Sequence, residues 1–436
     1  MASHIRHVAP KWPGGSWDLV RDEASTSTRG AEVVGKRCGC DSRDYGLGSS
    51  LVIHPLASLP WQSLIDGRNE GLPIKYIGSK RRLVPALGAL LNAAGARTAL
   101  DLFTGTTRVA HEFKKRGAEV TAMDSATYSK IFADCYIGTD SLAVDKDDLR
   151  DALAFLQSLP GEPGYFTETF CVQSRYFRPD NGAKVDAIRN AIESDFVGSS
   201  LYPILLTSLI EAADRVDSTT GLQMAYLKEW AARAFNPLEL RVPDLLPGPG
   251  RALLGDACEL TRTLGPFDLA YLDPPYNQHR YFTNYHVWET LVRWDAPEPY
   301  GIACKRSDSR EEQTKSVFNA KREMPIALKT VVDAVDARIL LLSYNNEAWI
   351  APEELIDMCS ARGHVEMLEF DSKRYVGAQI GIYNPSGDKV GKISHLRNFE
   401  LVAVCGERND VMDLLDRYRG GGGGVGNAEQ AQPTLF

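Results

Sequence analysis

Residues 273–277 form the segment Asp-Pro-Pro-Tyr-Asn, which directly follows the apolar run 267–272. Each proline fixes its own φ and pushes the preceding residue out of the α region, so the geometry of the segment is restricted. Asp273 and the main-chain carbonyl of Pro274 can accept the two hydrogens of an exocyclic amino group, while Tyr276 can stack on the ring that carries it. The sequence therefore predicts a site that holds an amino group on a planar heterocycle.

A second segment, residues 98–124, has the pattern of a nucleoside-binding unit. It predicts a buried strand, a tight loop around Gly105, a helix that ends at Gly117 and a second strand that ends at Asp124. Asp124 stands 19 positions after the loop glycine, which suits an acid that receives ribose hydroxyls in an α/β fold. An ordinary βαβ unit has the same pattern. Only one glycine of the dinucleotide fingerprint is present, which disfavours pyrophosphate binding.

Together these segments resemble the N6-adenine DNA methyltransferases of the D12 class. Residues 273–276 match their Asp-Pro-Pro-Tyr motif, and Asp-Leu-Phe-Thr-Gly-Thr at 101–106 resembles their S-adenosylmethionine loop, although Thr107 stands where the family usually has a second glycine. Residues 75–80, Lys-Tyr-Ile-Gly-Ser-Lys, resemble the segment that opens this class. The motifs follow one another in the order of the alpha group, in which the target-recognition region lies in the middle of the chain.

The resemblance implies S-adenosyl-L-methionine as the cofactor and no metal. It assigns cofactor contacts to Tyr76, Lys80, Asp101, Phe103, Gly105, Thr106, Asp124, Asp256 and Asp273. Lys80 can pair with the methionine carboxylate, and Tyr76 can cover the adenosine or the sulfonium. The alternative for Lys80 is a solvated basic face at the start of a helix that runs to about Ala94, with Pro85 predicting a kink or a later start. Asp256 could equally cap a short helix over 257–264.

Catalysis is assigned by the same resemblance to Asp273, Pro274, Pro275 and Tyr276. The candidate substrate contacts are Asn277, His279, Arg280, Tyr344 and Asn345. The last two belong to a Ser-Tyr-Asn-Asn-Glu segment that resembles one branch of the family, and we interpret it as the wall of the target-base pocket, although two adjacent asparagines are also typical of a turn. We expect Asn284, Tyr285 and His286 on the DNA-facing side, with a surface or satisfied role as the simpler interpretation of each histidine.

Composition limits the remaining function classes. The chain has 436 residues, of which 44% are apolar, enough for one large core and an inserted domain. It lacks an 18-residue apolar run and an N-terminal apolar signal core, so we predict a cytoplasmic protein without a membrane partner. The eight cysteines show no paired zinc spacing. A net charge of −8 argues against a generally basic nucleic-acid coat, but DNA affinity follows local patches, for which the candidates are 80–82, 305–306, 321–322 and 373–374.

We predict a doubly wound, Rossmann-like α/β methyltransferase fold with an inserted helical target-recognition subdomain. The predicted parts are an N-terminal extension, partly disordered (1–70), a first catalytic part that binds the cofactor (71–137), the helical insert (138–250), a second catalytic part (251–406) and a flexible tail (407–436). Within the insert, helices are predicted over 148–159, 183–193, 202–216 and 221–235. Leu205, Leu209 and Ile210 form an apolar stripe that favours helix packing.

The tail contains five glycines after Arg419 and ends in Gln-Pro-Thr-Leu-Phe. A glycine-rich segment behaves as a flexible tether. The terminal peptide resembles the one that docks in the bacterial DNA sliding clamp, with Gln432 as a hydrogen-bonding anchor and Leu435 and Phe436 in an apolar pocket. The usual motif has leucine where this chain has Pro433, and a chance match of so short a motif is the alternative.

The predicted function is methyl transfer from S-adenosylmethionine to the N6 amino group of a flipped-out adenine in a specific sequence of double-stranded DNA. The enzyme would serve a restriction-modification system, with a cognate restriction endonuclease as partner, or act as a solitary epigenetic methylase. One alternative is methylation of adenine in RNA or of the cytosine N4 amino group, because the same acceptor geometry serves any exocyclic amine. An alternative of another class is a non-catalytic DNA-binding or clamp-tethered regulatory module.

Overall fold

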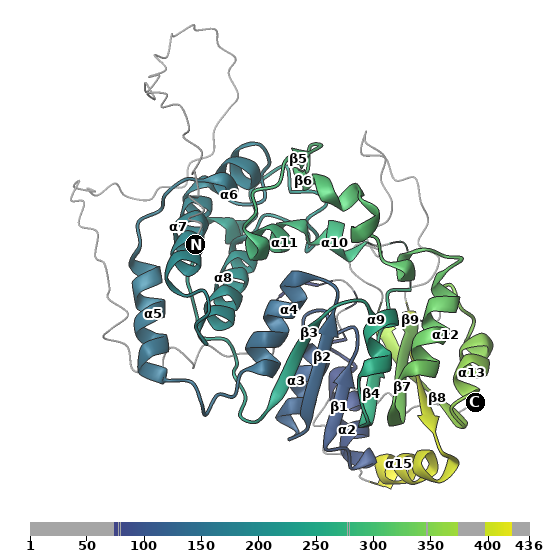
Figure 1. The fold of residues 1–436 in the computed structure, drawn as a ribbon. Coiled ribbons are helices and arrows are strands. Elements are labelled where there is room, and N and C mark those ends of the chain that lie inside the picture. The colour runs from purple at the N-terminus through teal and green to yellow at the C-terminus, as the bar shows by residue number, and fades with distance from the viewer. Residues whose placement is uncertain are drawn as a thin grey trace, which may run out of the picture. The chain divides into compact units, whose positions relative to one another are not determined.

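A seven-stranded sheet lies at the centre of the computed structural model, which describes residues 74–420 apart from 77, 79, 277, 279, 346, 347 and 374–396 (Figure 1). In spatial order its strands are β3 (Gly250–Leu254), β2 (Glu119–Asp124), β1 (Thr98–Asp101), β4 (Phe267–Leu272), β7 (Ala337–Asn345), β9 (Arg397–Gly406) and β8 (His364–Lys373). The first five are parallel, whereas β9 runs antiparallel to both β7 and β8. This order, with crossovers in both directions from β1, confirms the predicted doubly wound α/β fold.

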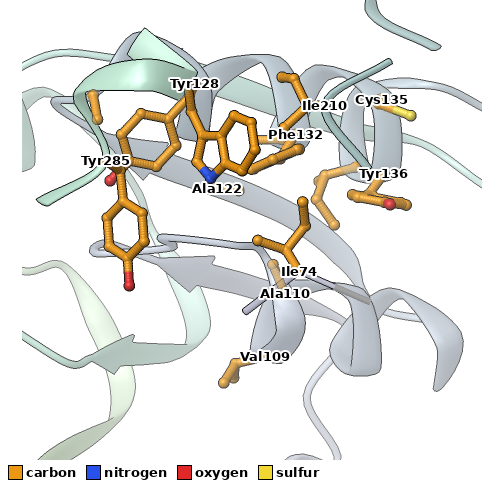
Figure 2. Packing of buried hydrophobic residues seen from close by; sticks show 14 of the residues in the cluster. Ile74, Val109, Ala110, Ala122, Tyr128, Phe132, Cys135, Tyr136, Ile210 and Tyr285 are labelled. Atoms are coloured by element: carbon orange, nitrogen blue, oxygen red, sulfur yellow. The ribbon is translucent and has the colours of Figure 1, made fainter. Parts of the chain in front are cut away.

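Strand residues alternate between two hydrophobic layers, because successive side chains of a strand point to opposite faces of the sheet. In β4, Leu269 and Tyr271 belong to one cluster and Ala270 and Leu272 to the other. The first face is covered by α2 (Val84–Ala94), α3 (Arg108–Lys115), α4 (Thr127–Ala133) and α15 (Arg408–Gly420). The second is covered by α9 (Ala257–Leu260), α12 (Met324–Ala334) and α13 (Pro352–Ser360). Figure 2 shows part of the first layer, where Ile74, Val109 and Phe132 gather.

Local signals account for the helix boundaries on the first face. α2 begins at Val84 with Pro85 in its first turn. A proline is tolerated there because the backbone N–H groups of the first turn have no intrahelical acceptor. The later start that Pro85 predicted is therefore confirmed. α3 ends one residue before Arg116, and Gly117 follows with φ +89°, as the helix-stop signal predicted.

The segment predicted as a helical insert contains α5 (Lys146–Ser158), α6 (Tyr165–Thr167), α7 (Pro179–Asp195) and α8 (Tyr202–Val216), with π-helical turns at Asp134–Gly138 (η2) and Glu168–Val172 (η3). α8 packs on α4, as Figure 1 also shows, and the apolar residues of both belong to one buried cluster. Leu205, Leu209 and Ile210 are buried there, so the helix-packing interpretation of this stripe is confirmed. The segment's boundaries and its role in target recognition remain predictions.

The helix predicted over 221–235 is wrong: only Ala232–Phe235 forms a short 3-10 turn, η4. The reason is Gln223, which is buried in a turn and hydrogen-bonds in several directions. Its backbone N–H donates to Asn284 O at 2.9 Å, and its side-chain Oε1 accepts from the backbone N–H of Val287 at 2.9 Å. These tertiary hydrogen bonds outweigh a local helical preference.

After β4 the chain forms α10 (Tyr281–Asn284), α11 (His286–Arg293) and a hairpin of β5 (Pro299–Tyr300) and β6 (Lys305–Arg306). The hairpin is followed by the 3-10 turns η6 (Ser307–Arg310), η7 (Glu312–Thr314) and η8 (Val317–Asn319), whereas the 3-10 turn η5 (Thr261–Thr263) precedes β4. The tail was predicted to be flexible from residue 407. Instead, α15 continues to Gly420, because Val411, Leu414 and Leu415 are buried in the first layer. The N-terminal extension 1–70 and the terminal peptide 432–436 lie outside the described residues. Within the described range, none of the helices combines the length and apolar character required to cross a bilayer.

Candidate active site

Two motif loops meet at the carboxyl edge of the sheet. β1 and β4 are adjacent and parallel, with Asp101 level with Tyr271, and the backbone N–H of Leu102 donates to Tyr271 O at 3.1 Å. The loop after β1 therefore lies beside the Asp-Pro-Pro-Tyr segment after β4. Such an edge, where crossovers leave in opposite directions, is where ligands bind in open α/β sheets.

The loop after β1 is held by two acids. The Gly105 N–H donates to Asp124 Oδ2 at 2.9 Å. Below the loop, Asp101 accepts from Thr104 Oγ1 and from the Ala110 N–H, each at 3.1 Å. Asp101 is only 1% exposed, burial raises its pKa to about 7, and its Oδ1 is buried without a partner among the described residues. Asp101 thus braces the loop from beneath.

Thr107 takes the conformation expected of the missing glycine. Its φ of 60° is left-handed, a region that a β-branched residue rarely adopts. Its N–H donates to Thr104 O at 2.7 Å, and its hydroxyl donates to Thr106 O at 2.7 Å. Thr106 and Thr107 are both buried. The loop is therefore tight despite the substitution.

A group of tyrosines covers the outer side of this loop. The Tyr76 ring stacks on Tyr285 with centroids 4.5 Å apart and on Tyr281 at 5.3 Å, while its hydroxyl lies 3.1 Å from that of Tyr128. A Cβ at Gly105 would lie 3.2 Å from the Tyr76 ring, so only glycine leaves the aromatic ring this close to the loop. The predicted position of Tyr76 at the cofactor loop agrees with this contact. Sequence reasoning missed the stacking partners, whose signal is two tyrosines four residues apart.

Lys80, Asp273 and Glu400 form an ion cluster, called here the Lys80 cluster. The Lys80 Nζ lies 3.1 Å from Asp273 Oδ1 and 3.0 Å from Glu400 Oε2. Lys80 is 7% exposed, so the solvated-face alternative is wrong for this residue, although Arg81 and Arg82 are exposed. Nothing in the sequence pointed to Glu400, which lies on β9, 320 positions from Lys80.

One cation serves two carboxylates in the Lys80 cluster, and the pKa values reflect that imbalance. Burial lowers the pKa of Lys80, but Asp273 and Glu400 more than compensate, so it lies well above its usual value. Burial raises the pKa of Asp273 to about 6, with Lys80 opposing the rise and Glu400 adding to it. Both pKa values therefore rise, although an isolated ion pair would lower that of the acid. We attribute this to desolvation and to the second carboxylate.

Tyr276 is fixed by its neighbours. Its ring meets Tyr344 edge-on, with centroids 5.4 Å apart, and the Lys80 Nζ lies 5.4 Å from its centroid. Tyr344 is only 1% exposed and accepts a hydrogen bond from the Ile350 N–H at 3.2 Å. Tyr344 therefore supports the Tyr276 ring, and its place in the wall of the target-base pocket remains a prediction. Asn345 lies within β7 rather than in a turn, and its Nδ2 is 3.4 Å from Glu400 Oε1.

The remaining predicted site residues divide into three groups. Asp256 caps α9 by accepting from the Cys258 N–H at 2.7 Å, so the capping interpretation is confirmed and its cofactor role remains a prediction. Phe103 packs edge-on against Phe318, with centroids 5.0 Å apart. Arg280 is exposed beside the Asp-Pro-Pro-Tyr segment. Asn277 and His279 lie outside the described residues.

The expectation that Tyr285 and His286 face DNA is wrong, because both are almost completely buried, whereas Asn284 is 5% exposed and lines an open cleft. The Nε2 of His286 lies 2.7 Å from Gln223 O, and burial lowers its pKa to about 3. His286 is thus an interior histidine that is hydrogen-bonded through Nε2, while its Nδ1 is buried without a partner among the described residues. Among the described residues, no group of three or more His, Cys, Asp or Glu side chains is arranged to hold a metal ion.

The residues at this edge fit S-adenosylmethionine. Asp124 ends β2 beside the loop, and each of its oxygens keeps acceptor capacity beyond the bonds to the Gly105 and Ala126 N–H groups. The Lys80 cluster carries one more negative than positive charge when its acids are ionised, which suits a neighbouring sulfonium. The Tyr76 stack adds an aromatic surface for an adenosine or a methylsulfonium.

Comparison with known proteins agrees with this geometry. The family model of the D12 class N6 adenine-specific DNA methyltransferase matches residues 76–358. The type II methyltransferase M.NlaIII of Neisseria lactamica is 30% identical over 69% of this chain and 92% of its own length, and M.CviAII of Paramecium bursaria Chlorella virus 1 is 29% identical over the same shares. The modification methylase StsI of Streptococcus sanguinis is 30% identical over 70% of this chain, which spans about half of that relative's length (50%). The chain therefore belongs to the D12 class N6 adenine-specific DNA methyltransferase family, and it is an adenine-specific DNA methyltransferase that uses S-adenosyl-L-methionine.

Proposed function

We propose that the enzyme methylates a flipped-out adenine within a specific duplex DNA sequence, with Asp273, Pro274 and Tyr276 as its catalytic groups. The observation that carries this assignment is the position of Asp273, which directly follows β4 beside the glycine loop after β1 and pairs with the buried Lys80. An amino group held by Asp273 would thus lie next to the cofactor loop. Pro275 restricts the backbone of the segment.

Tyr276 receives the base. The adenine amino group is hidden inside the duplex, so the nucleotide must leave the stack, at a cost of a few kcal/mol. Stacking on Tyr276 offsets part of that cost. Because Tyr344 and Lys80 already fix the ring of Tyr276, little side-chain entropy is lost when the base arrives.

Asp273 then reshapes the amino nitrogen. The lone pair of the amino nitrogen is delocalised into the purine ring. The Asp273 carboxylate and the Pro274 carbonyl each accept a hydrogen bond from the amino group, and this localises the lone pair on the nitrogen. When bound, S-adenosylmethionine supplies the activated methyl group. As the new N–C bond forms, the nitrogen becomes acidic and one amino proton can pass to Asp273. Lys80 holds the carboxylate in place at 3.1 Å, and the protein's contribution is position and electrostatics.

Asp273→Ala tests this assignment. Radiolabelled methyl transfer to host DNA should fall by at least a hundredfold, while Asp333→Ala on α12, where the acid pairs with Lys329 at the surface, should leave it unchanged. Mass spectrometry of the digested product should give N6-methyladenine. N4-methylcytosine as the product, or a preference for RNA oligonucleotides, would instead support the alternative substrates. Activity near wild type in Asp273→Ala would refute the catalytic role.

We extend the proposal to the enzyme's partners. M.NlaIII and M.CviAII are named as type II methyltransferases, which supports a role as the modification enzyme of a restriction system with a cognate endonuclease. A cytoplasmic location belongs to the same proposal, because it is where a bacterial DNA substrate would be found. Comparing host DNA with and without this gene for modified adenines tests the first point: unchanged methylation would contradict it.

The terminal peptide supports a separate partner, the DNA sliding clamp. Gln432, Leu435 and Phe436 would dock in the clamp, and the glycine tether would raise the local concentration of enzyme on DNA. Deletion of residues 432–436 should abolish capture of the enzyme by immobilised clamp and leave methylation of short oligonucleotides intact. Unchanged capture would end this part of the proposal.

A further inference from the structure

An open cleft lies beside the Asp-Pro-Pro-Tyr segment. We call it the basic cleft and define it by Gln278, Arg280, Asn284, Tyr300, Arg310 and Lys315. These residues come from the chain after the motif: α10, the β5–β6 hairpin and the 3-10 turns that follow. Figure 1 shows these elements together at one end of the domain, away from α15. The cleft therefore adjoins the segment on which a flipped base would rest.

Every charged side chain that lines the cleft is basic, in a chain whose net charge is −8. Arg280 and Arg310 are exposed, and neither has a carboxylate partner in the described part of the chain. The Arg310 guanidinium lies 5.5 Å from the centroid of Tyr300, which orients it without neutralising it. Lys315 pairs with Glu312, which is exposed. The cleft thus presents positive charge to solvent.

A neighbouring arginine, Arg306, differs from Arg310 because carboxylates neutralise its charge. Arg306, on the same hairpin, is buried and bonded at 2.7 Å to both Asp295 and Asp308. Its charge is neutralised and holds the base of the hairpin. Arg310, four residues later, has no such partner. The segment therefore separates one arginine that stabilises the fold from another that remains open to a ligand.

A buried amide on the cleft wall also lacks a partner. Asn284 is 5% exposed, and its Nδ2 makes no hydrogen bond among the described residues. A buried donor without a partner is unfavourable, so a ligand with an acceptor oxygen or nitrogen would stabilise this wall of the cleft. Phosphate oxygens and base edges both carry such acceptors.

Within the segment predicted to recognise DNA, Asn181 and Asp217 are buried and bond within the protein: Asn181 Nδ2 donates to Asn236 O at 2.9 Å, and Asp217 pairs with Arg233. We propose that the basic cleft holds the DNA backbone that flanks the target adenine, with Arg280 and Arg310 contacting phosphates. This inference rests on the proposed function, since it places the flanking DNA next to Tyr276.

Salt dependence of DNA binding tests the cleft without requiring methyl transfer. The probe is a fluorescently labelled 24-base-pair duplex of random sequence, titrated with the full-length protein between roughly 50 and 200 mM salt. Loss of two phosphate contacts in Arg280→Gln/Arg310→Gln should lower the slope of log K against log salt by about 2 and weaken binding at least tenfold near 100 mM. Arg310→Glu alone should weaken binding further than Arg310→Gln.

The matched control is Arg417→Gln, which removes an exposed arginine from α15 at the opposite end of the domain. It should keep the wild-type slope, and all variants should keep wild-type affinity for S-adenosylmethionine, which reports a folded active site. A double variant with the wild-type slope overturns the inference. If wild-type protein binds the duplex through the cleft but methylates no DNA, the proposed function fails and the cleft stands. If it binds no duplex, both fail.

Discussion

Glu400→Gln should move the acid limb of the enzyme's pH profile to lower pH. Asp273 must be ionised to accept a hydrogen bond from the amino group and to pair with Lys80. Burial and Glu400 raise its pKa to about 6, while Lys80 opposes the rise. The acid limb of kcat/KM should therefore lie near pH 6 in the wild type. The substitution keeps the shape of the side chain and removes the charge that opposes ionisation of Asp273.

The geometry sets the size of the shift. The two carboxylate oxygens lie 3.1 and 3.0 Å from the same ammonium nitrogen, so they are at most about 6 Å apart. Two charges at that distance interact by roughly 3 kcal/mol at an effective dielectric constant near 20. Both side chains are 18% exposed, and solvent screening reduces the effect to about 1.4 kcal/mol, or one pH unit. At pH 5 the variant should therefore keep about fivefold more of its plateau activity than the wild type.

The assay is kcat/KM for methyl transfer from pH 4.5 to 8, with each variant normalised to its own plateau. Glu407→Gln, just beyond the other end of β9, is the matched control and should keep the wild-type limb. Asp101 also faces Asp273, with its own pKa raised to about 7 by burial, so Asp101→Asn should be measured alongside to assign the limb. A lower plateau with an unmoved limb would mean that Glu400 is only structural, and a limb that moved upward would refute the electrostatic reasoning.

Three further changes follow from contacts in the same structure. Lys80→Met leaves two carboxylates without their cation, which raises the pKa of Asp273. The acid limb should therefore move above pH 6, and kcat/KM at pH 7 should fall about tenfold. A limb that moved to lower pH would contradict this. Tyr276→Phe keeps the stacking face and should stay within about threefold of wild type, whereas Tyr276→Ala should lower kcat/KM roughly 10- to 100-fold; equal losses in both variants would assign the effect to the hydroxyl. The folded protein holds His286 neutral, with its pKa lowered to about 3 by burial, while the unfolded chain protonates it below about 6.5. Its stabilising contribution is therefore present above pH 6.5 and lost toward pH 3, about 2 kcal/mol of it by pH 5. Urea unfolding at pH 7 and 5 should show that difference between wild type and His286→Gln, and parallel losses in both would exclude it.

Local chemistry was enough to predict the parts of this fold that the chain specifies over short distances. The strand ending at Asp124 and the strand preceding Asp273 are mostly apolar, with Thr121 and Asp268 as their interior polar residues, as buried parallel strands are, and α8 follows its apolar period from Tyr202 to Val216. The family resemblance also assigned Gly105 and Asp273 to one cofactor site. Parallel strands place their carboxyl ends at one edge, so the loop after β1 and the segment after β4 had to lie together.

Long-range contacts could not be predicted in the same way. Glu400 joins Lys80 across 320 residues and depends on how β9 inserts between β7 and β8, a pairing that no short motif specifies. Gln223 overrides the helical pattern around it because its partners come from α10 and α11. Tyr285 and His286 were expected to face DNA because they follow the catalytic motif, but they are buried where α11 packs against α4 and α8.

Thr107 shows why a motif's geometry can persist when its residue changes. The left-handed backbone costs a non-glycine residue roughly 1–2 kcal/mol, and two hydrogen bonds, from the Thr107 N–H to Thr104 O and from its hydroxyl to Thr106 O, each contribute roughly 1 kcal/mol in return. The two effects are of similar size, so the loop can keep the shape that a glycine would give it. What the cofactor loop requires is therefore a backbone conformation at position 107, and a glycine there is only the least strained way to obtain it.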